Sequence, residues 1–380
     1  MGKVAVINRT NFKNYGSVLQ CYALCRAVKK LGYDSEIVWV SGNLSKNFDF
    51  RLDKIASSLF TLATHPRLIS ATLTNAKDLG SRVISEETVR LFDEFVSSEI
   101  VQRTYSKREL SRKAKSDEYK KFICGSDQIW CSTTLYVDPL MYLRFAPKEK
   151  RISYAPSIGR DFIPDYNKRR MRKYINEIPC LSVREIEGKR LIKELCARDA
   201  TLVLDPTLLH TKNDYDALRG EIKADRKYML CYFLDTPSYE SQARLCEISR
   251  ELGAGVIALG SRLEVLEREG VDVAYPDCGP REFLSYIDGA DFVITDSYHG
   301  MLFSIIYEKE FLSLERAYKQ YDQSSRQKTV LRLLSLEERY ITSADGLCLG
   351  CTPIDYRSVS AKISEKRGES LAFLKNAIEN

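Results

Sequence analysis

The stretch Ala290 to Leu314, ADFVITDSYHGMLFSIIYEKEFLSL, decides the fold class. Phe292 to Ile294 is a short β-favouring run, and a polar turn from Thr295 to Gly300 interrupts it. Apolar residues return from Met301 to Tyr307, with the length of a short helix, before a second strand at Phe311 to Leu314. This strand, turn, helix and strand within 25 residues predict an α/β fold.

The polar turn is the candidate functional site. In an open α/β sheet, the ligand lies at the carboxyl ends of the strands, beside helix N-termini that attract anions. His299 would stand at that position, with Asp296 and Ser297 before it. The alternative for His299 is a polar cap on the helix that follows Ser297.

Further motifs accompany this turn along the chain: Asn14-Tyr15-Gly16 with Leu19-Gln20, Gly125-Ser126-Asp127-Gln128-Ile129-Trp130, Ser153-Tyr154-Ala155, Ser182-Val183-Arg184-Glu185 and Leu204-Asp205-Pro206-Thr207. Their order and spacing resemble those of the polysaccharide pyruvyl transferase family. The resemblance covers nearly the whole chain. It implies two Rossmann-like domains facing a cleft, in a glycosyltransferase-B-like architecture.

The order of predicted elements divides the chain into two domains. Residues 1–178 form an N-terminal Rossmann-like domain, with a helical excursion between about residues 45 and 119. Residues 179–357 form a second Rossmann-like domain that carries the DSYHG turn. A helical tail over 358–380 would pack back on the first domain, by analogy with glycosyltransferase-B folds.

Composition excludes some classes of function. The net charge of +6 comes from 58 basic and 52 acidic residues among 380, so we expect no nucleic-acid partner. The sequence shows neither a secretory segment nor a run of about 18 uncharged apolar residues, which predicts a cytoplasmic protein without an integral membrane segment. Its mild positive charge permits peripheral contact at the inner membrane face.

The eleven cysteines predict reduced thiols rather than a disulfide framework. Cys348 and Cys351 form one CxxC, but neither a second pair nor a nearby His completes a set of zinc ligands. We expect a plain loop there and no metal site, with a metal or redox site as the alternative.

A second polar loop follows the strand that ends at Cys124. Asp127 could accept a hydroxyl proton, with Ser126 and Gln128 beside it and Trp130 offering a flat apolar face to a sugar ring. The alternative is that Ser126 and Asp127 cap the segment that follows.

Candidate anion contacts come from two arginines. Arg184 ends a predicted strand, where a guanidinium grips a carboxylate or phosphate bidentately. The alternative is that Arg184 and Glu185 take part in separate salt bridges. Arg326 stands near a helix N-terminus, where a cation is unfavourable unless an anion compensates it. The alternative for Arg326 is an exposed surface position.

The first polar loop, over Arg9 to Gly16, lacks the GxGxxG pattern of dinucleotide-binding folds. Asn14 and Gly16 are either substrate-binding residues or part of a turn that merely needs a glycine. Their match to the family favours substrate binding.

The resemblance implies a reaction. Phosphoenolpyruvate is the donor, no cofactor is needed, and the product is a pyruvate ketal on two hydroxyls of a sugar or lipid-linked oligosaccharide. His299 would be the acid and Asp127 or Asp296 the base, with Arg184 as the main anion contact. Where some members have Arg-Leu before His-Gly, this chain has Ser297-Tyr298, so one cation is missing or supplied from elsewhere.

Two other functions remain open from the sequence. A nucleotide-sugar-dependent glycosyltransferase would use the same two-domain cleft. A non-catalytic glycan-assembly protein would retain the cleft and bind a sugar or a partner enzyme.

Overall fold

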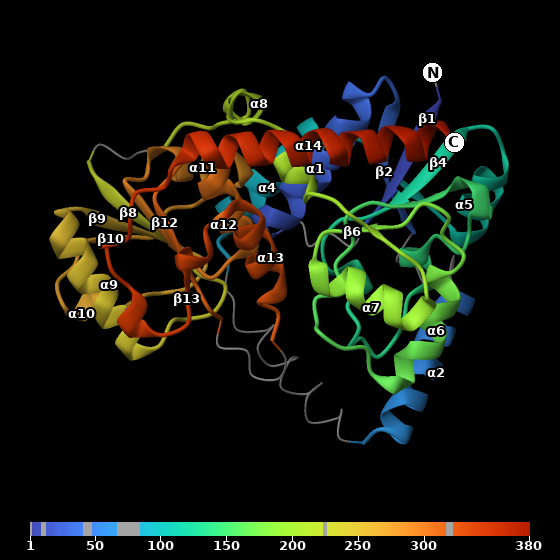
Figure 1. The fold of residues 1–380 in the computed structure, drawn as a ribbon, viewed down its shortest axis with the longest axis horizontal. Coiled ribbons are helices and arrows are strands. Elements are labelled where there is room, and N and C mark those ends of the chain that lie inside the picture. The colour runs from blue at the N-terminus through green and yellow to red at the C-terminus, as the bar shows by residue number, and fades with distance from the viewer. Residues whose placement is uncertain (1, 9–12, 41–47, 67–83, 223–225, 317–321) are drawn as a thin grey trace.

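The computed structural model describes residues 2–8, 13–40, 48–66, 84–222, 226–316 and 322–380. Two parallel β-sheets lie at the two ends of the molecule, with helices packed on their faces (Figure 1). The two halves are Rossmann-like and face each other. The predicted glycosyltransferase-B-like α/β architecture is confirmed.

The first sheet has the strand order β3-β2-β1-β4-β5, as in doubly wound nucleotide-binding folds. Its strands are β1 (Lys3–Ile7), β2 (Asp34–Val40), β3 (Gln102–Tyr105), β4 (Tyr119–Cys124) and β5 (Arg151–Ser153). Its helices are α1 (Tyr15–Lys30), α2 (Phe48–Thr64), α4 (Glu86–Glu99), α5 (Lys107–Lys115) and α6 (Asp165–Ile175). The predicted helical excursion therefore contains α2, α4 and α5, but also β3, which pairs in parallel with β2.

The second sheet has the order β10-β9-β8-β11-β12-β13, which reads 3-2-1-4-5-6 within this half. Its strands are β8 (Tyr228–Tyr232), β9 (Gly255–Leu259), β10 (Val273–Ala274), β11 (Phe292–Thr295), β12 (Phe311–Leu314) and β13 (Tyr340–Ile341). Its helices are α8 (Lys212–Asp216), α9 (Tyr239–Leu252), α10 (Glu264–Arg268), α11 (Pro280–Gly289), α12 (Tyr298–Ile306), α13 (Ser325–Leu334) and α14 (Tyr356–Glu379).

A connecting segment belongs to the first half rather than the second. It holds β6 (Ser182–Val183), α7 (Ile186–Cys196) and β7 (Thr201–Leu202). Cys180 forms a parallel bridge with Ile152 of β5, and apolar side chains of α7 pack into the first core. The boundary predicted between residues 178 and 179 is therefore too early, because burial of these apolar residues fixes the segment to the first sheet.

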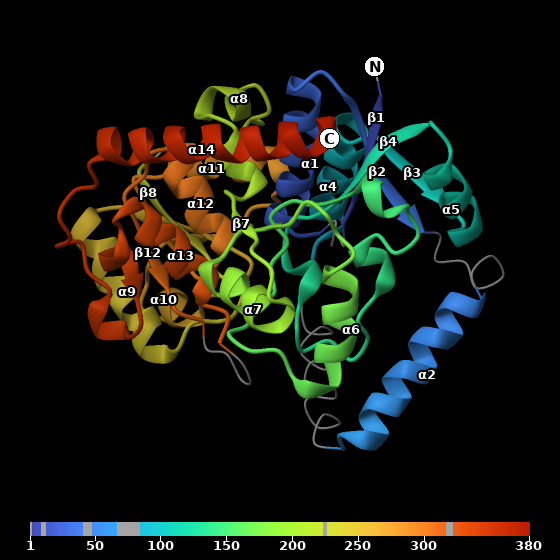
Figure 2. The ribbon, with the colours of Figure 1, turned by 45° about the vertical axis from the view of Figure 1, so that its right-hand side comes forward.

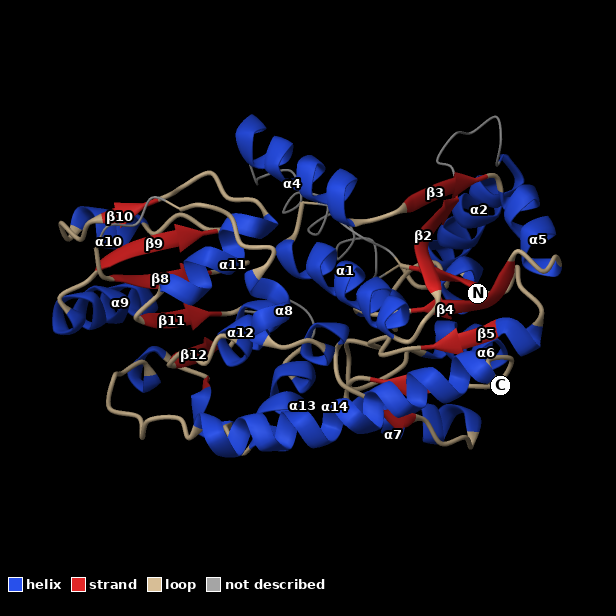
Figure 3. Ribbon diagram, turned by 90° about the horizontal axis from the view of Figure 1, so that it is seen from above, coloured by secondary structure: helices blue, strands red, loops and turns tan. Residues whose placement is uncertain are grey.

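Helices α1 and α14 join the two halves. Figure 3 shows α1 between the two sheets, with α14 running along both halves. The ring of Tyr15, in the first turn of α1, stacks on Phe283 of α11 with centroids 4.5 Å apart. Near the other end, Phe373 of α14 packs against Tyr154 of the first half. No helix in the described part of the chain is long and apolar enough to span a membrane.

Candidate active site

The candidate site lies where the carboxyl ends of the two sheets meet. Helix α1 begins after β1, helix α12 begins after β11, and the two helices are in contact. Loops that follow β4, β6 and β7 reach the same place. His299, Asp127 and Arg184, predicted from distant parts of the sequence, are brought together here.

Gly16 lies at a close approach between the two halves. It stands in the first turn of α1, where the side chain of Asn14 accepts a hydrogen bond from the Ser17 N–H at 3.0 Å. A Cβ atom on Gly16 would overlap the imidazole of His299. Asn14 thus caps the helix, and Gly16 is required for close packing rather than for a left-handed backbone.

Asp127 is held in an unusual conformation by the loop after β4. Its φ of +67° is rare for a residue other than glycine and costs free energy, as is often found at functional sites. Its carboxylate accepts hydrogen bonds from Ser17 Oγ at 3.2 Å and Arg184 Nη2 at 3.0 Å, and makes no capping bond. Burial favours a raised pKa, but the positive charge of Arg184 holds the pKa of Asp127 below its usual value.

Arg184 is a buried cation surrounded by acidic groups. Its Nη1 donates to Asp205 Oδ2 at 2.5 Å, and its Nε lies 4.0 Å from Glu185 Oε2. Burial opposes its charge, yet Tyr298 and the carboxylates around it raise its pKa. The alternative expected from the sequence, that Arg184 takes part in salt bridges, is therefore present. Glu185 has a partner of its own, since its carboxylate accepts from the Ser157 hydroxyl at 2.9 Å.

Arg326 reaches the same region from the first turn of α13. Its guanidinium lies over the ring of Tyr298 at 5.6 Å, and that of Arg184 lies over the same ring at 4.5 Å. With the Gln128 amide oriented to satisfy both of its polar atoms, its oxygen accepts from Arg326 Nη1 at 2.8 Å. Gln323 accepts from Arg326 Nη2 at 3.1 Å. Arg326 is buried, so the surface alternative is excluded.

Trp130 does not offer a face to a sugar, contrary to the prediction. Its side chain is 1% exposed, its ring stacks on Tyr142 at 5.0 Å, and its indole N–H donates to the Met141 carbonyl at 2.9 Å. Trp130 belongs to the hydrophobic core of the first half, because its ring is packed there and its indole N–H, the only donor of the side chain, is hydrogen-bonded.

Asp296 and Ser297 have structural partners. The Asp296 carboxylate accepts from the Leu234 N–H at 2.6 Å and the Asp235 N–H at 2.9 Å, which joins the ends of β11 and β8. Ser297 caps α12 by accepting from the Gly300 N–H at 3.3 Å. Of the two candidate bases, the geometry therefore places Asp127 beside His299 and Arg184.

Three further residues of the cluster are not among the predicted site residues, although two of them stand in motifs quoted from the sequence. Asp205, Tyr298 and Gln323 all contact a predicted site residue. The Asp205-Pro206-Thr207 motif was the available signal for Asp205, whose Oδ1 caps the next turn as expected of a turn residue, while Oδ2 pairs with Arg184. Ser126 also joins this network, since its hydroxyl donates to Asp205 Oδ2 at 3.3 Å and accepts from Arg184 Nη1 at 3.4 Å.

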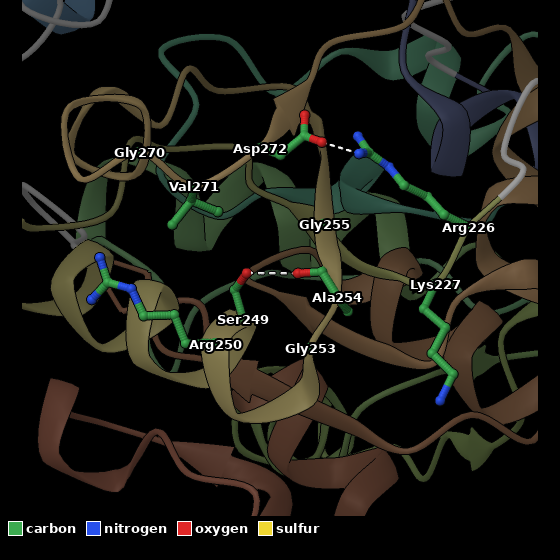
Figure 4. A pocket seen from close by; sticks show the side chains of 10 residues that line it. All are labelled: Arg226, Lys227, Ser249, Arg250, Gly253, Ala254, Gly255, Gly270, Val271 and Asp272. Carbon is green, nitrogen blue, oxygen red and sulfur yellow. Dashed lines mark hydrogen bonds and ion pairs between the residues drawn. The ribbon is translucent and has the colours of Figure 1, made fainter.

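A surface hollow of about 520 Å³ lies elsewhere, at the amino ends of β8 and β9 (Figure 4). It is lined by Arg226, Lys227, Arg250 and Asp272 among others. Ligands of open α/β sheets bind at the opposite, carboxyl ends of the strands. The hollow is therefore separate from the candidate site. The described residues contain no group of three or more His, Cys, Asp or Glu side chains suited to a metal ion.

Comparison with known families decides the identity. The model of the polysaccharide pyruvyl transferase family matches residues 14–318. The chain belongs to this family. Membership makes the chain a transferase enzyme that acts in polysaccharide biosynthesis. A search of curated proteins found no match.

Solved structures of similar fold include enzymes that act on nucleotide sugars. UDP-GlcNAc 2-epimerase from Neisseria meningitidis is 9% identical, with 100% of this chain and 98% of that chain covered and a TM-score of 0.47. ADP-heptose LPS heptosyltransferase II of E. coli is 10% identical, with 96% and 99% covered and a TM-score of 0.40. Anabaena HepE in complex with UDP and glucose is 11% identical, with 97% and 95% covered and a TM-score of 0.49. Such distant similarities carry no argument about the substrate of this pyruvyl transferase.

The packing of His299 on Gly16 predicts a matched pair of substitutions. Gly16→Ala should lower the free energy of unfolding by about 1–3 kcal/mol, because the added methyl overlaps the imidazole. Gly368→Ala, at an exposed position of α14 with open space around it, should raise it by about 0.5–1 kcal/mol. Urea denaturation measures both. Equal effects of the two substitutions would contradict the contact.

The buried carboxyl of Asp296 predicts a pH dependence of stability. Burial raises its pKa to about 6, above an unfolded value of about 4. The protonated Asp296 carboxyl therefore contributes its full amount to the free energy of unfolding below about pH 4. This contribution is lost as the pH rises through 6. Relative to Asp296→Asn, the wild type should lose about 1–2 kcal/mol of unfolding free energy between pH 5 and pH 8.

Urea denaturation at each pH measures this difference. Asp345→Asn, at an exposed position, is the control and should differ from the wild type by the same amount at every pH. A difference between wild type and Asp296→Asn that also stays constant would contradict the raised pKa.

Proposed function

We propose that this pyruvyl transferase moves the enolpyruvyl group of phosphoenolpyruvate onto two hydroxyls of one sugar. The products are a pyruvate ketal and inorganic phosphate. The acceptor sugar belongs to a cell-surface polysaccharide, such as a capsule or exopolysaccharide, or to its lipid-linked precursor. Beyond family membership, the observation that carries the proposal is the cluster of His299, Arg184 and Asp127 between the two halves, in which His299 and Arg184 are buried and Asp127 is partly exposed.

The reaction balances from donor and acceptor alone, without a cofactor. A proton added to the methylene carbon of the enol makes C2 electrophilic. The first sugar hydroxyl then bonds to C2 and loses its proton. The second hydroxyl also bonds to C2 and loses its proton, while the C2–O bond to phosphate breaks. The protein must therefore supply an acid, a base and contacts for the donor anions.

We assign the acid to His299 and the base to Asp127. Both belong to this cluster, and their charges interact. The lowered pKa keeps Asp127 ionised at neutral pH, as a proton acceptor must be. Asp296 suits this task less well, because backbone N–H groups occupy its carboxylate.

We assign the donor anions to Arg326 and Arg184, with Gln128 beside them. Arg326 supplies, from α13, the cation that the family pattern places before His-Gly and that Ser297-Tyr298 lacks. Both guanidiniums lie over Tyr298, so the two positive charges are held close together. Arg184 is also paired with carboxylates, and we assign the carboxylate and phosphate of the donor to the two arginines together. The side chains of Asn14, Ser126 and Ser297 support this site through hydrogen bonds to the backbone around it.

Donor binding tests the proposal directly. Arg326→Gln should weaken the binding of phosphoenolpyruvate at least ten-fold, because it removes charge-assisted hydrogen bonds of about 1.5–3 kcal/mol. Lys328→Gln is the control on the same helix, with a side chain 52% exposed, and should leave the Kd within two-fold. Isothermal titration calorimetry measures both.

Nucleotide sugars are titrated into the same samples. Binding of a nucleotide sugar without a response to phosphoenolpyruvate would replace this proposal with a glycosyltransferase. Equal loss of phosphoenolpyruvate affinity in both variants would contradict the role of Arg326.

We also propose that the enzyme works in the cytoplasm, in peripheral contact with the inner face of the membrane. Helix α2 projects from the first half in Figure 2. Its polar side contacts the body, since Ser57 accepts from Arg170 at 3.1 Å and Thr61 donates to the Leu135 carbonyl at 3.4 Å. Its apolar side is directed to solvent.

The exposed apolar residues of α2 are Ile55, Leu59 and Phe60, at 53%, 61% and 70%. Helix α6, which α2 contacts through Arg170, has exposed cations at Lys168 and Arg169 as well. An apolar helix face beside clustered cations complements an anionic lipid surface. A lipid-linked acceptor would place the reaction at that surface.

Vesicle binding tests this contact. The wild type should co-sediment with vesicles that contain phosphatidylglycerol, and the triple variant Ile55→Gln, Leu59→Gln, Phe60→Gln should bind at least ten-fold more weakly. The matched control replaces three apolar residues exposed elsewhere: Ile84→Gln, Val101→Gln and Tyr239→Gln. Equal binding by both variants would overturn the proposal, as would a dimer of the wild type that only the α2 variant dissociates.

A further inference from the structure

Asp205 occupies a fixed position between His299 and Arg184. It follows β7, and its side chain is buried. Its Oδ1 accepts from the Thr207 N–H at 3.0 Å and the Thr207 hydroxyl at 2.8 Å. Its Oδ2 pairs with Arg184 and lies 3.7 Å from His299 Nε2. Thr207 and Arg184 thus fix the carboxylate from its two oxygens, and Oδ2 is the oxygen on the side of the imidazole.

The two nitrogens of His299 have different surroundings. Nε2 is buried, accepts or donates no hydrogen bond, and has Asp205 as its charged neighbour. The Nδ1 edge instead faces Gly16 in the first turn of α1. The carboxylate therefore favours a proton on Nε2, and the neutral ring keeps its lone pair on Nδ1.

The helices around His299 oppose a positive charge on the ring. His299 lies in the first turn of α12, and the first turn of α1 faces it through Gly16. Both helix N-termini carry partial positive charge, which disfavours imidazolium. A general acid in this place consequently needs a fixed negative charge beside it.

The charged groups around His299 come from several elements. Asp205 follows β7 and Asp127 follows β4, while Arg184 follows β6 and Arg326 belongs to α13. Both oxygens of Asp127 accept hydrogen bonds, from Ser17 and Arg184, and both oxygens of Asp205 are engaged as well. Asp205 is the carboxylate that lies beside the imidazole, because its Oδ2 is 3.7 Å from His299 Nε2.

We propose that Asp205 is the positioning residue of an Asp205–His299 pair, which holds Nε2 and leaves Nδ1 to exchange the catalytic proton. In the reaction proposed above, on which this assignment of the proton rests, Nδ1–H protonates the methylene carbon of the donor. His299 is then neutral, with its remaining proton on Nε2 toward Asp205. A proton released by a sugar hydroxyl restores the acid form.

Side-chain NMR of the wild type and of Asp205→Asn tests the pair. The chain has three histidines, and the signal of His299 is assigned by its absence in His299→Ala. Neutral His299 in the wild type should be the Nε2–H tautomer. Asp205→Asn should lower the proton affinity of His299 at least ten-fold, seen as a lower midpoint of its titration.

Asp214→Asn is the matched control, since Asp214 Oδ2 lies 3.8 Å from Nδ1 of His210 in another Asp–His pair. It should leave the His299 titration unchanged. An Nδ1–H tautomer, or a midpoint that Asp205→Asn leaves unchanged or raises, overturns the proposal. If Asp205→Asn does not fold, the wild-type tautomer still decides. Neither readout needs a donor, so failure to bind phosphoenolpyruvate and failure of this pair are distinguishable.

Discussion

The close approach of two helix N-termini, those of α1 and α12, determines how the halves of this pyruvyl transferase meet. Gly16 permits it, because any side chain there would overlap His299. Two positive helix ends in contact repel each other unless negative groups lie nearby. Asp127 and Asp205 provide that charge, and Arg184 bridges them. The arrangement of the halves and the arrangement of the site therefore have the same cause.

Stability alone does not explain so much buried charge. Arg184 lies within 4.0 Å of three carboxylates, those of Asp127, Asp205 and Glu185, and its side chain is fully buried. Replacing such buried ion networks with apolar residues is often neutral or stabilising. The stability of the fold is therefore a poor reason for this network, and we propose that it serves as catalytic machinery.

The sequence predicted the regular parts of the fold well, because strong periodicity and local caps determine them. Strands β11 and β12 and helix α12 lie where their apolar patterns placed them. The edge strand β3 was missed because half of its residues are exposed and its pattern is weak. The position of α7 in the sequence also did not indicate that this helix packs into the hydrophobic core of the first half.

Side-chain roles were harder to predict than elements. An aromatic residue after a polar loop fits a sugar platform and a core position equally well, and only burial assigned Trp130 to the core. Asp205 lies 94 residues from His299, so its pairing with the imidazole depends on tertiary structure alone. The two arginines over Tyr298 likewise come from separate halves.

A crystal structure of the chain with bound phosphoenolpyruvate tests the central claim most directly. The account predicts donor density at the junction of the halves, with its carboxylate or phosphate on Arg326 and its methylene carbon toward His299 Nδ1. Density confined to the hollow between Arg226 and Arg250, or contacts that leave Arg326 and His299 untouched, would contradict it.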